Sequence, residues 1–168
     1  MTKNQAEFNA GDFVVYPSHG VGKIQGLETH NIAGQEVTLY AISFERERMT
    51  LKVPLSKAKA SGLRKLSSKK HMESVFKTLK SKAKAKKAVW SQRAQEYETK
   101  INSGDLVQLA EVVRDLHPKS KEHEQSFSEK QMYQSAFERL SREVAAVDEL
   151  GEKQAHKKLL EVLVDKAA

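Results

Sequence analysis

The segment from Lys77 to Arg93 concentrates positive charge around the only tryptophan of the chain, Trp90. It contains seven lysines and arginines and no acidic residue, which equals the net charge of +7 carried by all 168 residues. A concentrated basic strip is typical of proteins that bind a polyanion, whereas a lysine-rich helix face can also serve only solubility. The segment therefore predicts a nucleic-acid contact through Lys86 and Lys87, with a merely solvated face as the alternative.

Trp90 itself allows two interpretations. Trp90, Ala94, Tyr97 and Ile101 recur at i, i+4, i+7 and i+11, which is the spacing of a helix stripe that packs into a core. The same geometry places basic residues four before and three after the tryptophan on its own side of the helix. Spacing alone favours a packed Trp90, and an exposed aromatic beside a phosphate-binding strip is the alternative.

Enzymatic chemistry has little support in this sequence. The six histidines show no metal-ligand spacing with carboxylates, and the chain has no cysteine. Phosphate-binding loops of the G-x-x-x-x-G-K-S/T type and nucleophile elbows of the G-x-S-x-G type are also missing from the sequence. We therefore expect neither an enzyme nor a bound cofactor or metal.

The composition predicts a folded protein of the cytoplasm. Hydrophobic residues make up 39% and charged residues 30% of the chain, which is enough for a core and too apolar for a disordered chain. No apolar run approaches the roughly 18 residues of a membrane span, and the first residues do not resemble a secretory signal. The lack of cysteine suits a reducing compartment.

The elements that must position these residues change in type near residue 60. Between residues 12 and 54, four short segments rich in β-branched and aromatic residues alternate with turn-forming residues. With a fifth strand near 62–66 they predict a small β-barrel of about 55 residues, whose closure would remove exposed sheet edges.

After residue 66 the hydrophobic period becomes helical. We expect a bundle of about five helices, the first capped by Ser67 or Ser68. Ser128 and Gln131 fit a capping box that opens a long helix, and Gly151 fits the left-handed position at its end. The predicted fold class is α+β, with residues 1–66 forming the β domain and residues 67–168 the helical domain.

Two separate motifs carry a resemblance to a known family. The stretch Gly11–Gly22, GDFVVYPSHGVG, resembles the opening motif of the CarD/CdnL family of bacterial transcription regulators, which is shared with the transcription-repair coupling factor. The stretch Ser103–Leu116 resembles the helical-domain signature of that family, and Val89–Arg93 resembles its tryptophan-bearing segment. The likeness covers about residues 8 to 165.

The resemblance implies a specific function. The N-terminal module would be Tudor-like and dock on the β subunit of RNA polymerase. The helical domain would contact promoter DNA, with Trp90 wedged into the minor groove at the upstream edge of the melted bubble and Arg93 beside it. Such a protein would stabilise open complexes, including those at ribosomal RNA promoters. We expect it to act as a monomer that associates with the nucleoid through the polymerase. The resemblance thus favours an exposed Trp90.

The polymerase-contact positions that the resemblance implies are His30, Ile32 and Lys52. Lys52 stands where relatives often have an arginine, and His30 where some have another. Lysine lacks the planar fork of arginine, and histidine is only partly charged near neutral pH, so docking would be weaker or differently anchored. An ordinary exposed strand lysine is the alternative for Lys52.

A different class of function fits the same charge pattern, namely a free-standing nonspecific nucleic-acid-binding protein. The two hypotheses predict different partners for residues 1–60. That part of the chain is close to charge balance and has no clear aromatic and basic platform, which favours a protein partner for it.

Overall fold

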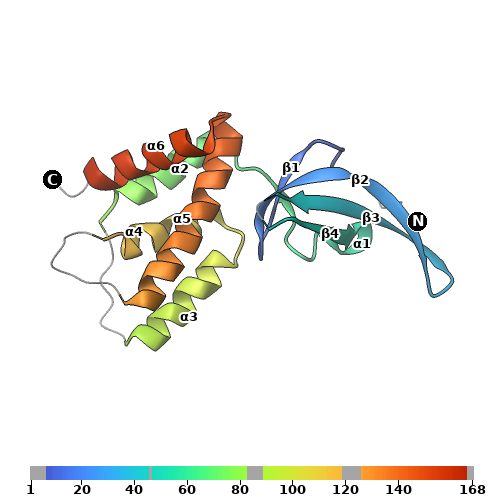
Figure 1. Ribbon diagram of the computed structural model, residues 1–168, viewed down its shortest axis with the longest axis horizontal. Coiled ribbons are helices and arrows are strands. Elements are labelled where there is room, and N and C mark those ends of the chain that lie inside the picture. Colours follow the sequence, from blue (N-terminus) through green and yellow to red (C-terminus); the bar gives the residue numbers. More distant parts are fainter. Residues whose placement is uncertain (1–6, 46, 83–88, 119–125, 166–168) are drawn as a thin grey trace. The chain divides into compact units, whose positions relative to one another are not determined.

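The computed structural model describes residues 7–45, 47–82, 89–118 and 126–165. The chain divides into two compact units, Met1–Leu66 and Ser67–Ala168. Figure 1 shows that strands make up most of the first unit and that the second is helical. The α+β class predicted from the sequence is thereby confirmed.

The first unit is built around an antiparallel sheet in the order β4-β3-β2-β1-β5. Its elements are β1 (Phe13–Tyr16), β2 (Gly20–Ile32), β3 (Gln35–Phe44), β4 (Met49–Pro54), the short helix α1 (Leu55–Ala58) and β5 (Arg64–Lys65). In the part of the chain that the structure describes, β4 and β5 end the sheet and do not pair with each other. Two sheet edges therefore remain where closure by hydrogen bonding was expected.

The hairpin between β2 and β3 turns on only two residues, Ala33 and Gly34. Both have positive φ, 53° and 82°, as a two-residue hairpin of this hand requires. Ile32 pairs with Gln35 immediately before and after the turn. Asn31 and Ile32 therefore belong to the strand, and β2 carries its side chains to the tip of the hairpin.

The core of this unit lies under one face of the sheet. Val14, Ile24, Ile42 and Phe44 are almost completely buried there. Gly22 allows this packing, because a Cβ at its position would lie 2.7 Å from side-chain atoms of both Ile42 and Phe44. In the sequence Gly20-Val21-Gly22, the second glycine is therefore explained by the close packing of the core.

The second unit consists, in its described part, of five helices. These are α2 (Lys69–Lys80), α3 (Trp90–Ile101), α4 (Leu106–Leu116), α5 (Phe127–Asp148) and α6 (Glu152–Asp165). Their apolar stripes meet in one core, in which Val75, Tyr97, Ala110 and Leu140 are fully buried. Within α4, Leu106, Leu109, Ala110, Val113 and Leu116 recur at helical spacing and are all buried.

The ends of the helices correct two sequence predictions. Ser68 caps α2 as expected, accepting a hydrogen bond from the backbone N–H of His71 at 3.1 Å. The cap of α5, however, is Ser126, whose hydroxyl accepts from the N–H of Glu129, so Ser128 lies inside the helix. The N-cap thus lies two residues before the predicted one. Likewise Glu149, and not Gly151, has the left-handed backbone at the end of α5.

Candidate functional site

The structure brings two of the predicted polymerase-contact residues together on a carboxylate. Glu28 Oε2 lies 2.9 Å from His30 Nε2 and also 2.9 Å from Lys52 Nζ. The three side chains are between 41% and 47% exposed. They form a small charged cluster on the surface of the sheet, which we call the Glu28 cluster.

The strand register explains why Lys52 reaches Glu28 from a strand that is not its neighbour. Lys52 is opposite Ala41, and Ala41 is opposite Gly26, so all three point to the same face of the sheet. Glu28 follows Gly26 by two residues and shares that face. Because Ala41 and Gly26 present almost no side chain, the lysine crosses β3 unobstructed to reach the carboxylate.

The contacts of the Glu28 cluster shift the pKa of Glu28. Hydrogen bonds from His30 and then from Lys52 lower the pKa of Glu28 below its ordinary value. These contacts favour the charged carboxylate because a donor or a cation stabilises negative charge. The cluster therefore holds one anion between two potential cations at neutral pH.

Ile32 adds an apolar position to the same strand. It is 53% exposed and lies two residues beyond His30, so it points to the face that carries the Glu28 cluster. A large aliphatic side chain exposed next to charged groups is typical of a protein contact. The predicted residues His30, Ile32 and Lys52 thus share one face of the sheet.

Trp90 begins α3 and lies at the margin of the helical core. Its side chain is half-buried and packs against the core cluster, with its ring centroid 6.3 Å from that of Tyr97. Tyr97, two stripe positions further, is fully buried. The residue before the helix, Val89, is 63% exposed. Burial therefore increases along the stripe, from the half-buried Trp90 next to the exposed Val89 to the buried Ile101.

Arg93 lies beside both aromatic rings of this stripe. Its guanidinium carbon is 5.7 Å from the Trp90 ring and 5.8 Å from the Tyr97 ring. It donates a long hydrogen bond of 3.4 Å to the Tyr97 hydroxyl, and its buried Nε has no partner among the described residues. A cation near a ring face is attracted to it, so Arg93 helps to hold the indole. Arg93 thus lies on the side of the helix that carries Trp90, as their i, i+3 spacing predicted.

Two of the residues predicted to contact DNA cannot be placed. Lys86 and Lys87 fall outside the described residues. Glu28, by contrast, is a residue of the candidate surface that the sequence analysis missed. Its signal was available, because residues i and i+2 of a strand share a face and Glu28 precedes His30 by two.

The described part of the chain offers no sign of a metal site or of a membrane span. Within it, no group of three histidine, aspartate or glutamate side chains is close enough to hold a metal ion. None of its helices combines the length and hydropathy that crossing a bilayer requires.

Comparison with known proteins agrees with the division into two units. Residues 8–67 match the family model of the CarD-like/TRCF RID domain, and residues 74–160 match that of the CarD C-terminal domain. A relative from Bacillus subtilis (strain 168), described as "Putative transcription factor YdeB", is 33% identical over 150 residues, which cover 88% of this chain and 96% of the relative.

A solved structure described as "CdnLNt from Myxoccoccus xanthus" is 36% identical, with a TM-score of 0.33, and the match covers 38% of this chain and 90% of that one. The two family models together span nearly the whole chain, and the relative is matched over almost its entire length. The chain therefore belongs to the CarD family of transcription regulators, which bind RNA polymerase.

Proposed function

We propose that this protein links the β subunit of RNA polymerase to promoter DNA and stabilises the open complex. In this proposal the N-terminal unit docks on the polymerase through His30, Ile32 and Lys52. The helical unit contacts the minor groove at the upstream edge of the melted bubble, where Trp90 acts as a wedge and Lys86, Lys87 and Arg93 neutralise phosphates. Ribosomal RNA promoters, whose open complexes are short-lived, would respond strongly.

The polymerase side of the proposal is supported by the surface of the first unit. Ile32 provides an exposed apolar side chain, and Glu28 contacts both Lys52 and His30 on the same face of the sheet. Interfaces combine such an apolar anchor with a polar rim that sets orientation. Because the cluster contains a carboxylate, it suits a protein surface of mixed charge better than a phosphate backbone.

The single observation that carries the DNA side is the position of Trp90 at the first residue of α3. At a helix start the indole is held from one side by Tyr97 and Arg93, while Val89 next to it is solvated. A wedge needs both properties, because it must be rigid and yet present an edge to the DNA. Stacking of a base on an aromatic side chain contributes about 1–3 kcal/mol, which would prolong a marginal open state.

The lifetime of open complexes tests this proposal. Complexes of polymerase and an unstable promoter are challenged with heparin in the presence of the full-length protein. We expect the wild type to prolong the lifetime and Trp90→Ala to shorten it again by about 5- to 150-fold, the equivalent of the stacking energy. Trp90→Ala should still bind polymerase. Ile32→Glu and Lys52→Glu should lose polymerase binding, whereas Lys65→Glu, on β5 of the same unit, is the matched control.

Two outcomes would contradict the proposal. If Trp90→Ala prolongs the lifetime as well as the wild type does, the indole is not the wedge. If the protein binds DNA but the wild type shows no affinity for polymerase promoter complexes beyond that of bare DNA, it acts as a free-standing nonspecific nucleic-acid binder.

A further inference from the structure

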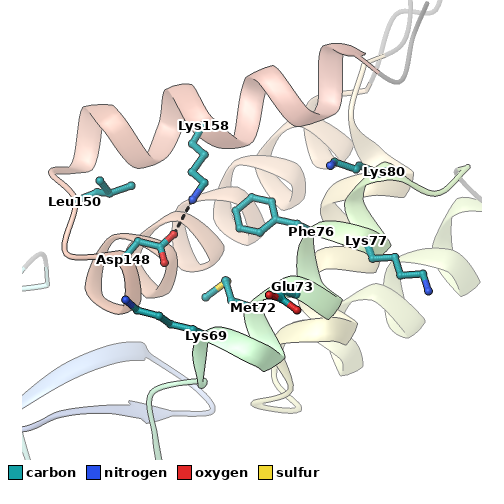
Figure 2. Close-up of a pocket in the computed structure, with 9 residues that line it drawn as sticks. All are labelled: Lys69, Met72, Glu73, Phe76, Lys77, Lys80, Asp148, Leu150 and Lys158. Atoms are coloured by element: carbon teal, nitrogen blue, oxygen red, sulfur yellow. Dashed lines mark hydrogen bonds and ion pairs between the residues drawn. The ribbon is translucent and has the colours of Figure 1, made fainter.

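A groove of about 680 Å³ runs between α2 and α6 in the helical unit, away from the Glu28 cluster and from Trp90. Figure 2 shows its floor, where Met72 and Phe76 of α2 face Leu150 at the turn before α6. Met72 is buried, and Phe76 and Leu150 are half-buried. The middle of the groove is therefore apolar and partly open to solvent.

Three lysines of α2 border this apolar floor. Lys69, Lys77 and Lys80 line the groove and are exposed. Positions i, i+8 and i+11 lie on one side of a helix, and eleven residues span about 16 Å. None of the three ammonium groups has an ion-pair partner within the described residues. Positive charge is thus available at both ends of the groove, with the apolar floor between.

Lys158, the fourth lysine of the groove, is already engaged. Its Nζ lies 2.9 Å from Asp148 Oδ2 and 5.0 Å from the centroid of the Phe76 ring. Figure 2 shows Lys158 reaching from α6 toward both groups. This ion pair leaves little net charge at the centre of the groove and ties α6 to α5 and α2.

The lining discriminates between classes of ligand. A nucleic-acid backbone would have to place phosphates beside the exposed carboxylate of Glu73, where a peptide helix can place an uncharged side chain. It would also cover an apolar floor to which phosphates contribute nothing. An amphipathic helix suits the groove better, because apolar side chains at i, i+3, i+4 and i+7 fill such a floor while charged neighbours reach the rim.

We propose that the groove between α2 and α6 docks an acidic amphipathic helix of another protein. Its apolar ridge lies on Met72, Phe76 and Leu150, and its carboxylates pair with Lys69 at one end and with Lys77 and Lys80 at the other. The groove shares Lys77 and Lys80 with the start of the basic segment, but none of its lining residues belongs to α3, and Trp90 and Arg93 are not among them.

Titration of the full-length protein with a model helix tests the proposal. The probe is a labelled peptide of about 18 residues, or about 27 Å of helix, with a leucine ridge and flanking glutamates. A second peptide carries glutamine at every glutamate position. Lys77→Glu combined with Lys80→Glu removes the charge at one end of the groove. Lys153→Glu combined with Lys157→Glu, at exposed positions of α6 outside the groove, makes the same charge change elsewhere.

We expect the groove double variant to bind the acidic peptide at least about tenfold more weakly than the wild type, as loss of matched charges at an interface predicts. The control double variant should stay within about twofold, and the glutamine peptide should bind weakly to every protein. Thermal unfolding followed by circular dichroism checks that the variants are folded, and Lys69→Glu tests the other end of the groove separately.

Three results would overturn the proposal. Equal weakening by both double variants would mean general attraction of an acidic peptide to a basic protein. Absence of binding to the folded wild type would exclude docking of this class of ligand. Preferential binding of a short DNA duplex that only the groove double variant abolishes would assign the groove to nucleic acid. None of these results depends on polymerase or on Trp90. The test of the groove therefore has an outcome that does not depend on the function proposed above.

Discussion

Glu28 illustrates how a single acidic residue organises a surface whose other members are basic. It draws His30 from its own strand and Lys52 from β4, two strands away in the sheet. If relatives place arginines at these two positions, each can reach a partner with its own planar fork. Here the lysine and the histidine instead share one carboxylate. The alternation of residues along β2 was sufficient to predict the shared face, but not the reach of Lys52 across β3.

The ionisation of Glu28 gives the first prediction. Its pKa is lowered, so the stabilisation from the cluster is present above the ordinary pKa and is lost as the pH falls through the lowered value. In Lys52→Gln the pKa of Glu28 should rise toward its ordinary value. The measurement is an NMR titration of the Glu28 carboxyl carbon in the full-length protein, with Lys65→Gln as the control. An unchanged pKa in Lys52→Gln would mean that the ion pair is not maintained in solution.

Trp90 combines the two interpretations that its spacing left open. Its ring packs on the margin of the core, as the stripe predicted, and one part of it remains accessible, as a wedge requires. Periodicity alone did not distinguish these cases, because the first residue of a stripe has neighbours on only one side. The position of Arg93 near the ring adds a local positive charge.

Fluorescence quenching tests this arrangement, and a single tryptophan makes the signal unambiguous. Because the Arg93 guanidinium attracts anions and repels cations near the indole, iodide should quench Trp90 more strongly than caesium at equal ionic strength. In Arg93→Gln the difference should shrink, whereas Lys100→Gln at the other end of α3 should leave it unchanged. Equal quenching by both ions in the wild type would contradict the placement of Arg93.

At the scale of elements, the sequence was informative about type and less so about ends. The strands of the first unit were predicted, but the two-residue turn between β2 and β3 was not, because it depends on Ala33 adopting a left-handed φ that alanine seldom does. The helix stripes of α2, α4 and α5 were predicted from their period. Their caps depend on which of several nearby serines accepts a backbone hydrogen bond, and Ser126 and Ser128 both precede suitable residues.

The two serines at the start of α5 yield a matched pair of variants. Ser126→Ala removes the hydroxyl that accepts from the N–H of Glu129 and should lower the free energy of unfolding by about 0.5–2 kcal/mol. Ser128→Ala, within the first turn, should change it by less than about 0.5 kcal/mol. Urea unfolding monitored by Trp90 fluorescence reports on the helical unit, which contains both sites. A larger effect of Ser128→Ala than of Ser126→Ala would mean that Ser128 is the N-cap, as the sequence predicted.

At the scale of the whole molecule, the two units present different kinds of surface. The first offers an apolar anchor and a mixed-charge cluster, and the second carries the basic segment and Trp90. Joining two weak contacts in one chain makes the second binding step intramolecular, which raises overall affinity without new contacts. In the proposed function, polymerase docking therefore delivers the tryptophan to a fork that it would seldom occupy alone.

The salt dependence of DNA binding distinguishes the contribution of the lysines from that of the tryptophan. Each phosphate neutralised on duplex DNA contributes about 0.9 to the slope of log affinity against log salt concentration, because a counterion is released. We expect Lys86→Gln combined with Lys87→Gln to reduce the slope by up to about 1.8. Trp90→Ala should leave the slope unchanged, because an uncharged ring displaces no ions, yet lower affinity for forked DNA by about 5- to 150-fold.

Fluorescence anisotropy of labelled forked and fully paired DNA, titrated with full-length protein at several salt concentrations, measures both quantities. The loss caused by Trp90→Ala should be larger on forked than on paired DNA, because stacking needs an unpaired base or an opened step. A slope that is insensitive to Lys86 and Lys87 would remove the basic segment from the interface. A slope that falls as much in Trp90→Ala as in the lysine variant would show that the ring positions the lysines instead of contacting the DNA, and the wedge would then have to be abandoned.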